Sequence, residues 1–112
     1  MSARRNPSPP AAPTSGPIRW NTTRITNPGD YEITSDDVVI VVVDPEDDVR
    51  VVLPAAGTAD NRQVWIKRFS SDHAVTIVVA DDDPIDDFSE IVLDVNGSGV
   101  HLASDGVHWM IL

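Results

Sequence analysis

Residues 91–112 read IVLDVNGSGVHLASDGVHWMIL, in which Asn96-Gly97 and Asp105-Gly106 separate three short apolar stretches. Both dipeptides favour two-residue hairpin turns, because each central position of such a turn needs a positive φ. The spacing therefore predicts an antiparallel meander of three strands. A two-residue turn at Asp105-Gly106 pairs Ser104 with Val107, Leu102 with Trp109, and Val100 with Ile111.

The two turns place one common set of side chains on a buried face, because side chains alternate between the two faces of a strand. The predicted buried face holds Ile91, Leu93, Val95, Val100, Leu102, Val107, Trp109 and Ile111. The opposite face holds Glu90, Val92, Asp94, His101, Ala103, His108 and Met110.

The preceding part of the chain also consists of short stretches rich in Val, Ile and Thr, separated by turn residues. No window shows a sustained helical period of apolar residues. The sequence therefore predicts an all-β fold: a small antiparallel β-sandwich or barrel-like module of short strands with an extended N-terminal arm. Strands are expected near residues 22–26, 31–34, 38–43, 49–53, 63–69, 74–79, 88–95, 99–104 and 107–112.

The run Val38–Val43 is apolar at every position, which in a strand means that both faces are covered. A module of this size has difficulty covering both faces from its own chain, so we expect the second face to pack against another copy of the protein. A central strand of a small sandwich is the single-chain alternative. The residues predicted at the contact between copies are Val39, Val41, Val43, His101, His108 and Met110.

Residues 1–20 are predicted to form an extended, Pro-rich, basic arm, followed by a single β domain over residues 21–112. Five of the nine prolines precede Ile18, and the first acid of the chain is Asp30. Proline fixes φ and removes a hydrogen-bond donor, so such a segment forms no packed element. Trp20 either closes the base of the domain's core or anchors the arm in a partner. The residues predicted to bind the partner are Arg4, Arg5, Pro9, Pro10, Arg19 and Trp20.

The formal net charge of −10 hides a strong division along the chain. From Asp30 onward four basic residues stand against eighteen acids, which gives this part a net charge of −14. A body of this charge repels phosphate, so we expect no nucleic-acid partner. The N-terminus lacks the apolar stretch of a signal peptide, and Val38–Val43 is too short to cross a bilayer. We therefore expect no membrane partner and synthesis in the cytoplasm.

Two acidic runs suggest calcium, since hard cations bind several carboxylate oxygens. Asp81–Asp87 lacks the residue order of an EF-hand loop, and Asp44–Asp48 is expected in the loop of a hairpin. His101 and His108 are expected on one face of a hairpin, where zinc would need further ligands that their neighbours do not supply. No nucleophile motif is present. The sequence therefore predicts no catalytic residue, no metal site and no cofactor.

Several strand and turn stretches carry a resemblance to a known family. They are Ile33-Thr34-Ser35-Asp36-Asp37, the valine strand ending at Asp44, Val51-Val52-Leu53-Pro54, Trp65-Ile66-Lys67-Arg68, Ala74-Val75-Thr76-Ile77, Ile85-Asp86, and Ser104-Asp105-Gly106 followed by Trp109. On the basis of these stretches, residues 31–112 resemble a β-module that is common in bacteriophage virion appendages. It occurs there in tail-fibre pieces and in capsid-decorating proteins. Such modules often have glycine after Ile-Asp, whereas this chain has Asp87. The resemblance implies a structural virion protein, typically trimeric, and transfers no catalytic residue.

The expected function is trimeric decoration of a phage capsid, as a cement or head protein on the capsid exterior of the virion. The arm is expected to hold it there in part, so the expected partners are further copies in a homotrimer and the major capsid protein. A receptor-binding or fibre-tip module of a phage tail is the alternative. A small carbohydrate- or calcium-binding domain unrelated to phages is a third reading.

Overall fold

The computed structural model describes residues 21–70 and 72–112, and its regular structure is almost entirely β. The predicted N-terminal arm lies outside these residues. The two helices in this part of the chain are 3-10 turns of three residues each, and neither has the length or hydropathy of a membrane span. The elements are β1 (Thr22–Ile25), β2 (Gly29–Glu32), β3 (Val39–Val43), β4 (Val49–Leu53), η1 (Ala56–Thr58), β5 (Arg62–Phe69), β6 (Val75–Val79), η2 (Ala80–Asp82), β7 (Ile91–Leu93), β8 (Gly99–Ser104) and β9 (Trp109–Ile111).

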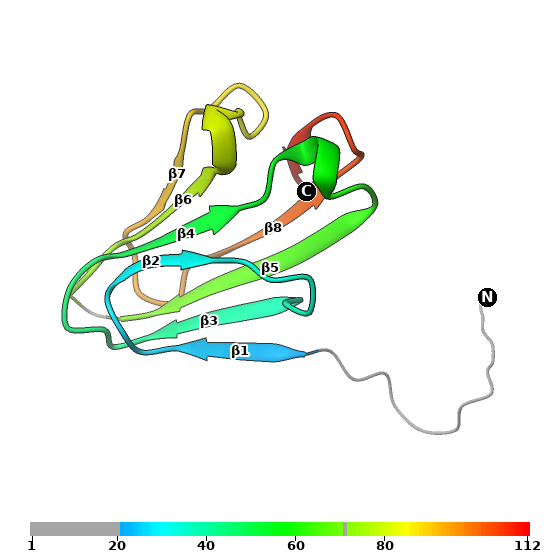
Figure 1. Ribbon diagram of the computed structural model, residues 1–112. Helices are drawn as coiled ribbons and strands as arrows, with labels where there is room; N and C mark the ends of the chain where they lie inside the picture. Colours follow the sequence, from blue (N-terminus) through cyan, green and yellow to red (C-terminus); the bar gives the residue numbers. More distant parts are fainter. Residues whose placement is uncertain (1–20, 71) are drawn as a thin grey trace, which may run out of the picture.

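The first six strands alternate between two sheets, so the chain winds as a coil (Figure 1). β1, β3 and β5 are parallel neighbours in a five-stranded sheet of order β1-β3-β5-β8-β9. β2, β4 and β6 are parallel neighbours in a four-stranded sheet of order β2-β4-β6-β7. Both sheets are therefore mixed, and the expectation of an antiparallel module is wrong.

The predicted hairpin between β3 and β4 is also wrong, because residues 44–48 carry the chain from one sheet to the other. Asp44 adopts a positive φ of 39° at the point where β3 ends. The turn is then held by neighbouring coils, since Gly29 N donates to Asp48 O and Val49 N donates to Ala74 O. Placing β3 and β4 in different sheets lets their apolar faces cover each other across the core.

The last three strands close the coil with antiparallel pairing. β7 pairs with β6 and β8 with β5, so Asn96-Gly97 joins two sheets and the predicted three-stranded meander is wrong. β8 and β9 do form a hairpin, with Ser104 opposite Trp109 and four residues in the turn. The Asp105 carboxylate stabilises this longer turn by accepting hydrogen bonds from Val107 N at 2.8 Å and His108 N at 2.7 Å.

The hairpin register differs from the predicted one by two residues, which leaves every strand side chain on its predicted face. Leu102 and Trp109 are accordingly buried, as predicted. Val95, Val107 and Ile111 were also predicted to be buried, and this is wrong. Val95 and Val107 lie in turns and are 65% and 70% exposed, and Ile111 of β9 is 37% exposed. The Trp109 indole also donates a hydrogen bond to Pro54 O at 2.8 Å, which ties the last strand to the loop after β4.

One hydrophobic core lies between the sheets and draws on alternate residues of both. Ile40 and Val42 of β3 are fully buried, whereas Val39, Val41 and Val43 are only partly buried on the other side of the strand. One face of the valine run is therefore covered by the protein's own four-stranded sheet. The remaining core residues are Ile25, Val49, Val51, Leu53, Ala56, Ala59, Val64, Ile66, Val75, Ile77, Val79, Ile85, Leu93, Leu102 and Trp109.

Candidate functional site: the outer face of the five-stranded sheet

The side of the five-stranded sheet that points away from the core carries apolar side chains from β3, β5, β8 and β9, together with polar and basic ones. These positions alternate with buried ones along each strand, which assigns them to the outer face. We call this surface the five-strand face. It consists of Thr22, Arg24, Val39, Val41, Val43, Gln63, Trp65, Lys67, Phe69, Gly99, His101, Ala103 and Met110.

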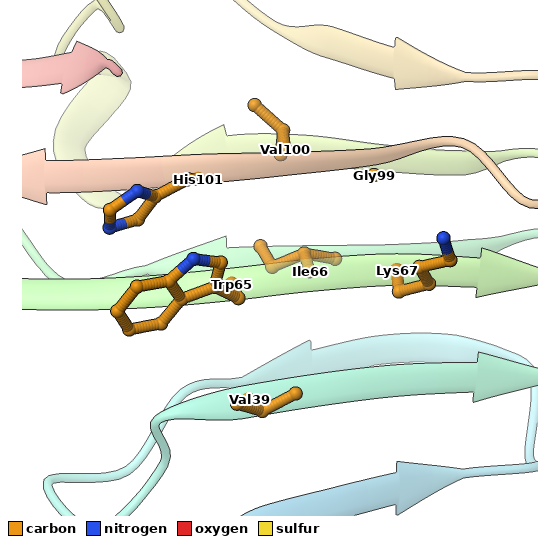
Figure 2. Close-up of a pocket in the computed structure, with 7 residues that line it drawn as sticks. All are labelled: Val39, Trp65, Ile66, Lys67, Gly99, Val100 and His101. Atoms are coloured by element: carbon orange, nitrogen blue, oxygen red, sulfur yellow. The ribbon is translucent and has the colours of Figure 1, made fainter. Parts of the chain in front are cut away.

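The strand register brings three of these side chains into one row. Trp65 of β5 lies opposite Val39 on one side and His101 on the other. The Trp65 and His101 rings are stacked, with centroids 3.9 Å apart and planes inclined by 12° (Figure 2). His101 Nε2 also lies 2.9 Å from Gln63 Oε1. The imidazole of His101 therefore contacts two residues of β5, Trp65 by stacking and Gln63 by a hydrogen bond.

A shallow hollow of about 500 Å³ lies beside this stack (Figure 2). It exists because Gly99 faces Lys67 across the β5–β8 pair and contributes no side chain. A Cβ atom at position 99 would lie 3.1 Å from Ile66 O and 3.4 Å from the Lys67 Cδ atom. The hollow is lined by Val39, Trp65, Ile66, Lys67, Gly99, Val100 and His101, a set with one charged group and no acid.

The five-strand face is positively charged, whereas the protein as a whole has a formal net charge of −10. All five strands of this sheet lie within the described residues, and they contain no Asp or Glu. Arg24 and Lys67 are its cations, and Lys67 Nζ lies 5.5 Å from the centroid of the Phe69 ring. Phe69 itself is 47% exposed. A chain with eighteen acids thus presents one apolar face from which acids are missing.

Most of the residues predicted at a contact between copies lie on this face. They are Val39, Val41 and Val43 on β3, His101 on β8 and Met110 on β9, with β5 between β3 and β8. His108 does not join them, because it lies exposed in the four-residue turn between β8 and β9. Trp65 lies on the same face, between Val39 and His101. The residues predicted to bind a partner through the arm, Arg4, Arg5, Pro9, Pro10, Arg19 and Trp20, lie outside the described residues.

Within residues 21–70 and 72–112, the run Asp81–Asp87 forms no group of three ligand atoms close enough to hold a metal ion. Within the described residues, one group has ligand atoms close enough for a metal, namely Asp47, Asp48 and His73, all within 4.8 Å of one another. Asp48 Oδ1 accepts a hydrogen bond from Ala74 N at 3.0 Å and lies 3.5 Å from His73 Nδ1. These contacts tie the β3–β4 turn to the β5–β6 turn, which is a structural use of the carboxylate.

Asp37 is a buried carboxylate that the sequence did not single out. It is 4% exposed and accepts hydrogen bonds from Thr23 Oγ1 at 2.5 Å, Tyr31 Oη at 2.7 Å and Thr34 N at 2.8 Å. Burial alone would raise the pKa of Asp37, but the hydrogen bonds from Thr23, Thr34 and Tyr31 together hold it below its ordinary value. The pKa of Tyr31 is raised, first by burial and then by its hydrogen bond to Asp37.

Arg62 completes this network from the start of β5. Its Nη2 atom donates to Thr34 O at 2.6 Å and to Asp37 O at 2.7 Å. The network therefore joins β1, β2, β5 and the 33–38 turn at the first coil. Its side chains satisfy one another, which indicates a structural role. A buried acid cannot be recognised in a sequence where exposed acids are this numerous.

Arg68 is the second polar residue that sequence reasoning missed. It follows Ile66 on the core side of β5 and is 3% exposed, with Nε donating to His73 O at 2.6 Å. Among the described residues, Nη1 has no hydrogen-bond partner. Side chains of β5 alternate strictly between the core and the outer face, and this alternation points Arg68 toward the core. An arginine is not expected in a core, so its burial was not predicted.

Comparison of the chain with protein-family models, with curated proteins and with solved structures finds no match.

Proposed function

We propose that this protein is a non-enzymatic assembly protein that associates with further copies of itself through the five-strand face. One observation carries the proposal: the five strands of this sheet contain no acid, although the chain has eighteen. Carboxylates on this surface would be desolvated by a partner at a cost of several kcal/mol each, whereas valine and aromatic side chains gain about 25 cal/mol per Å² removed from water.

The specific form that we propose is trimeric decoration of a phage capsid. The resemblance of residues 31–112 to virion β-modules supports it. In this proposal the body is a two-sheet sandwich, and residues 1–20 are an extended arm that reaches the major capsid protein. Location on the capsid exterior is part of the same proposal.

The test is a pair of valine variants measured by sedimentation velocity. Val41→Glu places an acid in the middle of the five-strand face, and we expect it to yield folded monomers. Val107→Glu is the matched control, because Val107 is 70% exposed in the turn between β8 and β9 and is not part of the five-strand face. We expect the control to sediment like the unmodified chain. Association that survives Val41→Glu undiminished would refute the proposal.

A further inference from the structure

The outer side of the four-stranded sheet is a second partly apolar surface, and its charge is the reverse of that on the five-strand face. The register places Glu32 beside Val52 and Val78, and it places Arg50 beside Thr76 and Val92. We call this surface the four-strand face. It consists of Asp30, Glu32, Arg50, Val52, Thr76, Val78, Glu90 and Val92.

Val52 and Val78 of the four-strand face are direct neighbours, with Glu32 on the β2 side and Glu90 on the β7 side. Val92 is 45% exposed, and Val52 and Val78 are partly buried. Glu90 lines a hollow of about 380 Å³ together with Val52, Val78 and Arg50. Glu32 and Glu90 are both exposed.

Arg50, the cation among the residues of the four-strand face, forms a salt bridge within that face. Arg50 Nη2 lies 3.0 Å from Asp30 Oδ2, whereas Glu32 and Glu90 form no salt bridge within the described residues. Asp81 and Asp82 add two further acids to the lining of the hollow. The four-strand face therefore combines one exposed and two partly buried valines with a net negative charge. The five-strand face combines the partly buried valines of β3 with Arg24 and Lys67 and has no acid.

We propose that the five-strand face of one copy packs against the four-strand face of the next copy. This inference rests on the proposed function, because it names the surface that a second copy offers. Packing two five-strand faces against each other would bring Arg24 and Lys67 toward their own counterparts, and like charges at an interface are unfavourable. The acids of the four-strand face offer them opposite charges instead.

A contact between two different faces has a consequence for symmetry. Such a contact is heterologous, so it builds a closed ring where the rotation between copies allows closure, and an open stack otherwise. A two-fold dimer is excluded as the product. Every interface in a cyclic trimer is heterologous, but the two faces lie on opposite sides of one core, so closure into the proposed trimer requires the contact to be strongly inclined to the sheets.

The test is charge reversal on each face, measured as the association constant of the full chain by sedimentation equilibrium. Lys67 and Glu90 are both exposed, so Lys67→Glu and Glu90→Lys leave the core intact. We expect each single variant to associate at least about tenfold more weakly, and the double variant to regain most of the loss. Glu46→Lys is the control on an exposed turn, and it should have no such effect.

Each contrary outcome identifies a different failure. If Glu90→Lys associates normally while Val41→Glu is monomeric, the pairing of faces is wrong and the proposed function stands. If the unmodified chain is monomeric, both are wrong. If deletion of residues 1–20 creates an association that the full chain lacks, the occupant of the five-strand face is the chain's own N-terminal segment, and the pairing is again wrong.

Discussion

The imidazole of His101 lies flat against the indole of Trp65, with the ring centroids 3.9 Å apart. The two residues are direct partners in the antiparallel register of β5 and β8, so the backbone itself brings the rings together. Aromatic pairs contribute about 0.5–1.5 kcal/mol beyond the burial of their rings. The pair thus presents an ordered aromatic surface in the middle of the five-strand face.

We expect His101→Ala to leave the fold intact and to weaken self-association by up to about tenfold, because the unstacked indole must be ordered when the partner binds. Thermal unfolding and sedimentation equilibrium measure the two effects separately. His108→Ala is the matched control, since His108 is exposed in the turn. Equal effects of the two substitutions on association would contradict the role of the stack.

The Asp37 network predicts a stability that depends on pH. The folded-state pKa of Asp37 is lowered from its ordinary value of 3.8, so the unfolded chain binds the proton more readily. The stabilisation is therefore fully present above about pH 4 to 5, and it is lost as the pH falls through 3.8 toward the lower folded-state pKa. Urea unfolding across this range should show that loss.

Asp37→Asn should reduce the free energy of unfolding at neutral pH by about 2 kcal/mol, because the amide replaces a charged acceptor of three hydrogen bonds. It should also flatten the pH dependence below about pH 4. Asp36→Asn is the control, since Asp36 is exposed beside it. A pH dependence that is identical in both variants would show that Asp37 is not its source.

Leu102 and Trp109 have no exposed surface, so Leu102→Asp or Trp109→Asp would bury a charge with no partner. We expect each to cost about 4 kcal/mol or more and to unfold the domain. Val107→Asp, in the turn between them, should be nearly neutral. Circular dichroism and thermal unfolding measure both results, and a native-like melting temperature for Trp109→Asp would contradict the assigned core.

Deletion of the N-terminal segment distinguishes the two proposed roles, capsid decoration and receptor binding. We expect a chain without residues 1–19 to keep its self-association while losing most of its affinity for undecorated capsids. In the proposed capsid-decorating role, several arms per assembly would increase the affinity for capsids, because anchoring one would raise the effective concentration of the others. Co-sedimentation with capsids measures the affinity, and full occupancy by the truncated chain would favour the receptor-binding alternative.

The sequence predicted the strands well and their partners poorly. Alternation of Ile40 and Val42 with Val39, Val41 and Val43 is a local property, and it placed each side chain on a face whatever strand lay beside it. The buried positions of Leu102 and Trp109 survived a hairpin register that was two residues out, because a shift of two preserves the faces.

The pairing of the strands could not be predicted from the sequence in the same way. A short acidic turn such as 44–48 serves equally to reverse a strand within a sheet or to cross to the facing sheet, and only contacts with other coils decide between them. The bonds from Gly29 N to Asp48 O and from Val49 N to Ala74 O join residues far apart in the chain. The five-strand face was predicted in part, through its valines, but its lack of acids became visible only when the five strands were placed side by side.

The most direct test of assembly through the five-strand face is the protection of a single thiol placed there. The chain has no cysteine, so Val41→Cys introduces the only thiol, and Val107→Cys provides an exposed reference. The rate of maleimide labelling is measured for each as protein concentration rises from below to above the range of self-association. We predict that labelling at position 41 slows strongly with assembly while labelling at position 107 is unchanged. Equal labelling rates at position 41 in the monomer and in the assembly would contradict the account.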